Sequence, residues 1–264
     1  MMSVQWGSAT DPGRVRAINE DSYLVAPSVF VVADGMGGHA AGEVASAMAV
    51  GEFRALAERS ELLTEEIVEA IARANQQILE SGRKYDTRKG MGTTLAGVGI
   101  VRAGGSSHWA VFNVGDSRVY HYVHGKLHQI SIDHSEVQEL ISAGYITPEE
   151  AKIHPDRNVV TRSLGTDPAP VPDVWVFPPV AGERFLVCSD GLSRELDDAE
   201  IENILHREPV AQQAASALVT CAVEAGGRDN ITVLVIDFAG SPTDGLGRAI
   251  DEDTAPRQHG LVGF

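Results

Sequence analysis

The sequence predicts an α+β domain in which two antiparallel β-sheets pack together and helix pairs cover their outer faces. Most apolar runs are short, rich in valine and isoleucine and separated by turn residues, as is typical of strands. Segments with helical spacing lie before, between and after groups of these runs, which argues against a series of parallel βαβ units. Strands joined by only a few residues must be antiparallel, because a parallel crossover needs about a dozen residues or more.

The strands are expected at the apolar runs. In chain order these are 30–33, 94–101, 108–114, 118–123, 126–131, 174–177, 184–189 and 231–238. The second and third runs are linked by Ala-Gly-Gly-Ser-Ser, and the fourth and fifth by His124-Gly125. Each of these two pairs therefore predicts a β-hairpin.

Four segments carry apolar residues at helical spacing. They are 42–58, 64–81, 197–206 and 209–225. Thr64 is expected to cap the second helix, because its hydroxyl can accept a hydrogen bond from a free N–H of the first turn. Asp197 and Glu200 have the spacing of a capping box at the third helix, and Pro209 is expected to open the fourth.

Residues 134–166 interrupt the succession of strands. They contain polar helical pieces, including Thr147-Pro148-Glu149-Glu150, which has the pattern of a capping box with proline at the first helical position. We interpret this segment as an insertion between strands, and such long insertions often border sites. The folded domain is expected to span 1–239, followed by a polar, loosely packed tail at 240–264.

The composition narrows the classes of partner. The formal net charge is −16, from 21 basic and 37 acidic residues, which argues against nucleic acid or an anionic membrane as the partner. The two cysteines make neither a disulfide framework nor a zinc motif. The N-terminal segment lacks the apolar core of a signal peptide, and no apolar run approaches the length of a membrane span. We therefore expect a cytoplasmic protein, and a monomer.

Carboxylates recur at or next to the ends of apolar runs. The set comprises Glu20, Asp21, Asp34, Asp116, Asp190 and Asp229. Taken singly, each aspartate has the ordinary interpretation of a turn or a helix cap. If the strand ends converge, however, the carboxylates share one pocket, where they repel one another unless a cation binds. Oxygen ligands without matching histidines and cysteines favour Mg²⁺ or Mn²⁺ over zinc.

The residues beside these carboxylates also suit a phosphate and a metal. Gly35 has no side chain, so its carbonyl can approach an ion closely, and the glycines after it leave room for a ligand. Arg14 or Arg16 could pair with a phosphate through the planar guanidinium fork, although an arginine taken alone is more often a solvated surface residue.

Other phosphate and nucleophile motifs do not fit. The stretch from Gly35 has Ala40 where a dinucleotide fingerprint needs its third glycine, and the antiparallel strands lack the βαβ setting. There is no Walker Gly-Lys-Ser/Thr sequence, and Ser189 is not flanked as in a nucleophile elbow. The carboxylates thus remain the feature that carries chemistry.

Taken together, the motifs resemble those of the metal-dependent serine/threonine protein phosphatases of the PPM, or type 2C, family in their bacterial form. The matching stretches are Arg16–Ser22, Val32–His39 with Gly42 and Glu43, Gly92–Thr94, Asn113–Arg118, Asp133-His134, Thr161–Gly165, Cys188–Leu192 and Arg228–Asn230. They follow one another in the order of the family and span nearly the whole chain. One such motif alone is weak, whereas the full series is highly specific.

The resemblance implies a β-sandwich with a metal centre at one end and residues 134–166 as a flap beside it. By position, Asp34 would bridge two Mn²⁺ or Mg²⁺ ions, with the Gly35 carbonyl on one of them and Asp190 and Asp229 on the other. Glu20 and Asp21 would act largely through metal-bound waters. Asp116 with Asp190 matches the position of a third ion in bacterial members, and Arg16 matches the phosphate clamp.

The resemblance also implies the reaction: hydrolysis of phosphoserine and phosphothreonine by in-line attack of a water that bridges two divalent ions. Many eukaryotic relatives carry a histidine directly after Asp-Gly, where this chain has Met36. His39 or a metal-bound water would then give the leaving group its proton.

Two alternatives remain open at this stage. One is a catalytically inactive relative that only binds phosphoproteins, which the complete set of metal carboxylates disfavours. The other is an unrelated Mg²⁺ or Mn²⁺ hydrolase of small phosphoesters. The expected partners are phosphorylated serine and threonine proteins, substrates of a bacterial serine/threonine kinase.

Overall fold

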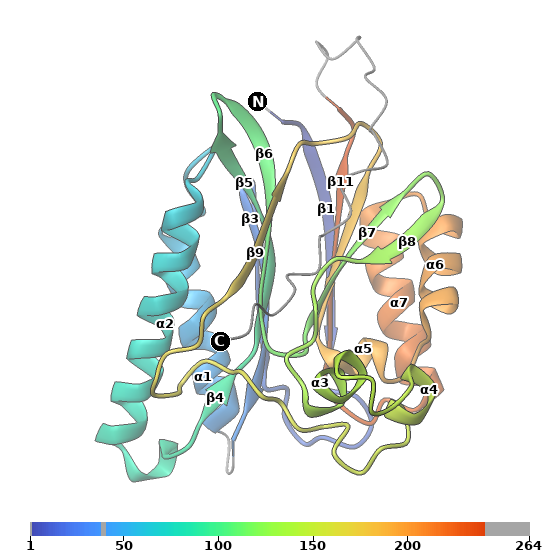
Figure 1. Cartoon of the computed structure of the whole chain (residues 1–264). Coiled ribbons are helices and arrows are strands. Elements are labelled where there is room, and N and C mark those ends of the chain that lie inside the picture. The colour runs from blue at the N-terminus through green and yellow to red at the C-terminus, as the bar shows by residue number, and fades with distance from the viewer. Residues whose placement is uncertain (1, 38–40, 241–264) are drawn as a thin grey trace.

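Two antiparallel sheets face each other in the centre of the molecule (Figure 1). The computed structural model describes residues 2–37 and 41–240. The first sheet has the strand order β1 (Val4–Asp11), β11 (Ile231–Phe238), β10 (Arg184–Cys188), β7 (Arg118–Val123) and β8 (Lys126–Gln129). The second has the order β2 (Asp21–Ala26), β3 (Val29–Met36), β5 (Leu95–Ala103), β6 (Ser106–Val114) and β9 (Asp173–Phe177), with β4 (Gly92–Thr93) on β3. All these pairings are antiparallel, as predicted.

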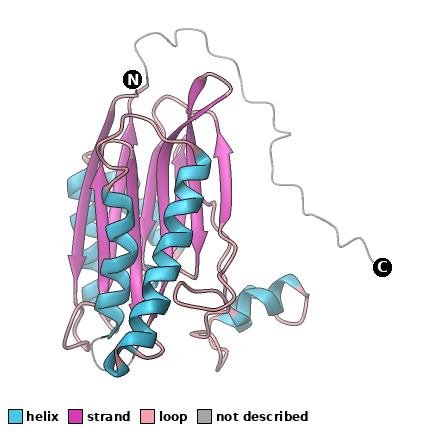
Figure 2. Cartoon of the chain, turned by 90° about the vertical axis from the view of Figure 1, so that its left-hand side faces the viewer, coloured by secondary structure: helices cyan, strands magenta, loops and turns pink. Residues whose placement is uncertain are grey.

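One helix pair covers each outer face. In Figure 1, α1 (Ala41–Arg54) and α2 (Thr64–Lys84) lie beside the second sheet, and α6 (Asp198–Arg207) and α7 (Ala211–Ala225) beside the first. Figure 2 looks onto the α1 and α2 side, where both helices lie in front of the sheet and run roughly along its strands. The predicted α+β sandwich is thus confirmed. The remaining short helices are η1 (Asp86–Arg88), α3 (Glu136–Ser142), α4 (Pro148–Ala151) and α5 (Asp190–Ser193).

Large apolar side chains fill the space between the sheets. Phe30, Trp109 and Phe185 are fully buried there, and the rings of Trp109 and Phe185 lie 5.0 Å apart. The Trp109 indole N–H donates to Glu183 Oε1 at 2.5 Å, so the one polar atom of this ring has a partner. Burial of each such side chain stabilises the fold by about 1.5–3 kcal/mol. This packing holds the strand ends rigidly in place.

The structure corrects several expected element boundaries. Thr64 is the first residue of α2 rather than its cap; the cap is Leu63, whose N–H donates to Glu66 Oε2 at 2.8 Å. α7 begins at Ala211 and not at Pro209, and α1 ends at Arg54 rather than at residue 58. The capping boxes at 147–150 and 197–200 are confirmed.

Three strands were not predicted. β1 is an edge strand with a mostly polar sequence, so it carries no apolar run. β2 is also an edge strand, and β4 has only two residues. Edge strands and very short strands bury little apolar surface, and the periodicity that reveals strands is weak in them.

The segment between β8 and β9 is the predicted excursion. It carries α3 and α4, which lie near the lower end of the sandwich in Figure 1. His134 ties its first residues to the sheets: its Nδ1 accepts from the Gly115 N–H at 3.0 Å, and its Nε2 lies 3.1 Å from Asp173 Oδ2. Of the expected tail, residues 241–264 lie outside the described residues, and the domain boundary at 239 stays a prediction. None of the described helices has the length and apolar character that crossing a membrane requires.

Candidate metal centre

The strand ends that carry the predicted carboxylates meet at one end of the sandwich. Asp21 at the start of β2 pairs with Asp34 near the end of β3, and Cys188 at the end of β10 pairs with Arg118 at the start of β7. In the same sheet, β11 begins where β1 ends. This end is the lower one in Figure 1, near β4 and α5.

Asp34 is held by the threonines of a neighbouring segment. Its N–H donates to Thr94 Oγ1 at 3.0 Å, and its carbonyl accepts from the Thr94 N–H at 2.9 Å and the Thr93 hydroxyl at 2.8 Å. The Thr94 hydroxyl also lies 2.7 Å from that of Ser117, the neighbour of Asp116. These contacts give the Gly-Thr-Thr stretch a positioning role and link the Asp34 backbone to the β6–β7 turn.

Gly35 faces Gly42 across a space too small for a side chain. A Cβ on Gly35 would overlap the Gly42 carbonyl, and a Cβ on Gly42 would lie 2.6 Å from Glu20 Oε1. The Gly35 N–H donates to the Glu20 carbonyl at 3.2 Å, and the Gly42 N–H donates to Glu20 Oε1 at the same distance. The glycines therefore let β3, α1 and Glu20 approach closely.

Asp190 is the first residue of α5, separated from β10 by Ser189 alone, and is 8% exposed. Ser189 beside it donates its hydroxyl to Asp21 Oδ2 at 2.7 Å. The second oxygen of Asp21, Oδ1, is buried and has no hydrogen-bond partner among the described residues, and the same holds for Asp190 Oδ1. Two buried carboxylate oxygens thus lack the partner that burial normally demands.

Asn230 fixes the loop that carries Arg16 and Glu20. Its side-chain amide donates to the carbonyls of Pro12 at 3.0 Å and Ile18 at 2.9 Å, and its Oδ1 accepts from the Glu20 N–H at 2.8 Å. Asp229 directly before it is thereby kept beside this loop. Asn230 has no role that its motif alone predicts, since its three partners are more than 200 residues away in the chain.

Burial and mutual repulsion disfavour the ionised forms of these carboxylates. Burial, followed by the negative charge of Asp190, raises the pKa of Asp34 well above its usual range. Burial and the charge of Asp116 do the same to the pKa of Asp190, which Arg194 opposes. Burial also raises the pKa of Asp116, and it raises that of Asp21 to about 6. A bound cation would reverse these shifts.

Two arginines hold the outer members of the set. Arg16 pairs with Asp229 through two contacts of 2.9 Å, Nε with Oδ1 and Nη2 with Oδ2. Arg194 pairs with Asp190, and its Nη2 lies 3.4 Å from Asp116 Oδ2. No sequence pattern singled out Arg194, because an arginine after a one-turn helix usually lies in solvent.

The donor set fits hard divalent cations. It consists of carboxylate oxygens and a backbone carbonyl, which Mg²⁺ and Mn²⁺ prefer, and two of its buried oxygens are unpartnered. Nevertheless, in the ranges 2–37 and 41–240 no three histidine, cysteine, aspartate or glutamate side chains stand ready around one ion. In this arrangement Arg16 pairs with Asp229, and Arg194 pairs with Asp190 and Asp116.

The structure brings together the predicted site residues that it describes. Asp21, Asp34, Asp116, Asp190 and Asp229 influence one another's charge, and Glu20 and Gly35 lie beside them. Met36 ends β3, as the strand pairing with β4 requires. His39, the proposed proton donor, lies outside the described residues.

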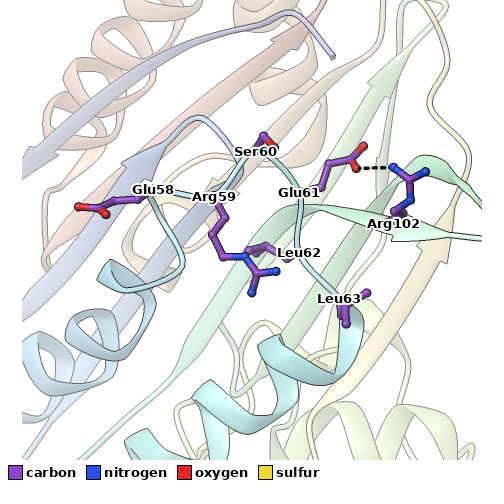
Figure 3. A pocket seen from close by; sticks show the side chains of 7 residues that line it. All are labelled: Glu58, Arg59, Ser60, Glu61, Leu62, Leu63 and Arg102. Carbon is purple, nitrogen blue, oxygen red and sulfur yellow. Dashed lines mark hydrogen bonds and ion pairs between the residues drawn. The ribbon is translucent and has the colours of Figure 1, made fainter.

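A surface hollow of about 500 Å³ lies at the other end of β5 (Figure 3). Its lining is Glu58, Arg59, Ser60, Glu61, Leu62, Leu63 and Arg102. Glu61 points toward Arg102, and Glu61 Oε2 accepts from Arg102 Nη1 at 3.1 Å. The lining contains none of the predicted site residues, so we do not assign the chemistry to this hollow.

Comparisons with known proteins agree with this geometry. A family model described as protein phosphatase 2C matches residues 14–225. The serine/threonine phosphatase Stp of Listeria monocytogenes is 39% identical over 239 residues, which cover 86% of this chain and 93% of Stp.

Solved structures give the same result. The crystal structure of the Mycobacterium tuberculosis serine/threonine phosphatase PstP superposes with a TM-score of 0.83 and 37% identity, covering 90% of this chain and 99% of that chain. A structure of the PstP catalytic domain in complex with two manganese ions has the same TM-score and 35% identity, covering 91% of this chain and the whole of that one.

Proposed function

The chain belongs to the protein phosphatase 2C family of metal-dependent serine/threonine phosphatases, and from this membership we propose which of its residues bind the metal ions and the phosphate. The observation that carries the proposal is the pair of unpartnered buried oxygens, Asp21 Oδ1 and Asp190 Oδ1, in a cluster of mutually repelling carboxylates. Buried oxygens normally have a hydrogen-bond partner, so oxygens without one are expected where they bind a cation instead.

Asp34 is the central ligand of the proposed centre. Its pKa is raised by burial and by the charges of Asp190, Asp21, Asp116 and Asp229, so it lies among the other four aspartates of the set. Its backbone is fixed by Thr93 and Thr94. Asp190 and Asp229 approach from the other sheet, and the Gly35 carbonyl lies one residue further along β3. When bound, divalent ions there supply Lewis acidity, which makes a water nucleophilic near neutral pH and offsets charge on phosphoryl oxygens.

Arg16 is the proposed phosphate clamp. It now holds Asp229 with two N–H groups in a bidentate pair, the geometry that a phosphate also accepts. If a cation were bound to Asp229, the attraction of this carboxylate for Arg16 would weaken, and the planar fork of Arg16 would be available to the substrate phosphate. Loading of the metal centre and binding of the phosphate are therefore coupled in this proposal.

The proposed substrates are proteins that a serine/threonine kinase of the same cell has phosphorylated on serine or threonine. Among the described residues, Cys188 lies near the site but is no nucleophile, because burial raises the pKa of its thiol and keeps it protonated. Direct attack by water, without a covalent enzyme intermediate, is consistent with this. A phosphoproteome comparison between wild type and Asp190→Asn would identify the substrates as phosphosites whose occupancy rises in the variant.

His39 is carried forward, on its position in the sequence, as the donor of a proton to the departing hydroxyl. A general acid matters for an alkoxide leaving group and not for p-nitrophenolate, which leaves without a proton. His39→Ala should therefore slow hydrolysis of a phosphothreonine peptide while leaving that of p-nitrophenyl phosphate nearly unchanged. Equal effects on both substrates would remove His39 from this role.

The test of the metal centre is activity after chelation. The EDTA-treated protein should hydrolyse neither p-nitrophenyl phosphate nor a phosphothreonine peptide, and Mn²⁺ or Mg²⁺ should restore both activities. Asp34→Asn should stay inactive with Mn²⁺ while its circular dichroism spectrum matches the wild type. Activity that survives full chelation would sink the metal assignment.

A further inference from the structure

Arg194 contacts three carboxylates of the proposed centre at once. Its N–H donates to the Asp190 carbonyl at 2.9 Å, which folds the chain back by one helical turn. Its Nη2 pairs with Asp190 Oδ2 and lies 3.4 Å from Asp116 Oδ2, and its Nη1 lies 3.5 Å from Asp229 Oδ2. One guanidinium therefore joins residues from three separate parts of the chain.

Two of the three carboxylates, Asp116 and Asp190, are buried, whereas the contact with Asp229 is exposed. Asp116 and Asp190 are 7% and 8% exposed, and the Arg194 side chain is only one-third exposed. Burial would lower the pKa of Arg194, but the surrounding carboxylates raise it above its ordinary value. Arginine stays charged in proteins in any case, so this position holds a permanent positive charge.

We propose that the Arg194 guanidinium takes the place between Asp116 and Asp190 that the family resemblance assigns to a third divalent ion, so that this chain binds two ions. This inference rests on the metal centre proposed above. An ion shared by the two carboxylates would lie about 2.0–2.1 Å from their oxygens. It would meet Nη2 at the same oxygens, where two like charges repel strongly.

The two carboxylate oxygens of Asp190 have different partners in this proposal. Oδ2 pairs with Arg194, whereas the buried Oδ1 has no partner among the described residues. Asp190 can therefore keep Arg194 on one side and serve a metal ion on the other. Asp116, in contrast, gives its Oδ2 to Arg194 and is not needed as a ligand.

The test counts bound ions, independently of activity. Equilibrium dialysis against excess Mn²⁺, followed by elemental analysis, should find two ions per wild-type chain and three per chain of Arg194→Gln. Arg194→Lys, which keeps the charge, should remain at two. Asp116→Asn should leave the wild-type count at two and should return the count of Arg194→Gln from three to two.

Three results would overturn the inference: a wild type with three ions that Asp116→Asn reduces to two, an Arg194→Gln protein that still binds two, or a wild type from which Asp116→Asn removes one of two. If Arg194→Gln does not fold, as judged by its circular dichroism, the Asp116→Asn count in the wild-type background decides alone.

A separate variant tests the proposed metal centre itself. Asp34→Asn should lose bound Mn²⁺ from the wild-type count. An unchanged count in Asp34→Asn would overturn the ligand assignment together with this inference, whereas a third ion in the wild type overturns the inference alone.

Discussion

The arginines near the two ends of β10, Arg184 and Arg194, each pair with an aspartate, and the two pairs differ in completeness: Arg184 is buried, whereas the Arg194 side chain is one-third exposed. Arg184, at the first residue of the strand, uses all five of its N–H groups. Asp237 accepts two of them, at 2.5 and 2.9 Å, and the carbonyls of Leu205, Glu208 and Pro209 accept the others at 2.8–2.9 Å. Every N–H donor of Arg184 therefore has an acceptor.

At the other end of β10, Arg194 faces three carboxylates, and Asp190 keeps an oxygen without any partner among the described residues. Arginine pairs with aspartate at both ends, but around Arg194 the negative charges outnumber the positive charge. The difference teaches that the pair at Arg184 has all its hydrogen bonds made, whereas the carboxylate cluster at Arg194 keeps a buried oxygen to spare, as the proposed cation site requires.

The largest expected effect comes from Asp190→Asn. Turnover of p-nitrophenyl phosphate at saturating Mn²⁺ should fall on the order of 10³-fold, because charge that stabilises the transition state is no longer held in place. The EDTA-treated variant should melt no lower than wild type, since a buried charge has been removed. Asp197→Asn, which alters only the cap of α6, is the control with normal turnover; normal turnover in Asp190→Asn as well would erase the contrast between the two ends.

Asp237→Ala should lower stability and leave metal binding unchanged, the opposite of Asp190→Asn. It leaves Arg184 buried without its carboxylate, which should lower the free energy of unfolding by about 3–5 kcal/mol in urea denaturation. Mn²⁺ affinity and the metal dependence of the remaining folded protein should match wild type. A loss of Mn²⁺ affinity without a loss of stability would show that both ends of β10 serve the site.

The pH dependence of stability in the metal-free protein should reveal the raised pKa of Asp21. Its pKa is raised from 3.8 to about 6 by burial, so the unfolded state loses this proton first as pH rises. In EDTA, wild type should therefore lose stability relative to Asp21→Asn between pH 4 and pH 6, by up to roughly 3 kcal/mol, and the difference should level off above that range. The measurement is urea unfolding of both proteins across this range. A constant difference would mean that the carboxyl titrates alike in both states.

The smallest expected effect is that of Arg16→Gln. Loss of a charge-assisted pair with phosphate should lower kcat/KM for a phosphothreonine peptide by roughly 10–100-fold, mainly through KM. Arg14→Gln, two residues earlier in the same loop, is the matched control and should change little. If kcat and KM both stay at the wild-type values in Arg16→Gln, the phosphate clamp must be sought elsewhere.

Much of this architecture could be predicted because it depends on burial. Strands such as β3 and β11 are continuous apolar runs, and a carboxylate at the end of such a run stands out against it. β1 could not be found in this way, since its edge position leaves it polar. Glycine pairs show the same limit: Gly35 has an evident use after Asp34, but its contact with Gly42 depends on how α1 crosses β3.

Residue types and their spacing were thus sufficient to predict the sandwich and the metal dependence of the family, and they singled out carboxylates that the structure brings to one edge. They could not reveal which charges meet. The contacts of Arg16 with Asp229 and of Arg194 with Asp116 join residues 213 and 78 positions apart. Such contacts exist because antiparallel pairing brings distant strand ends to one edge, and the coulombic energy of a charge depends on distance in space, not along the chain.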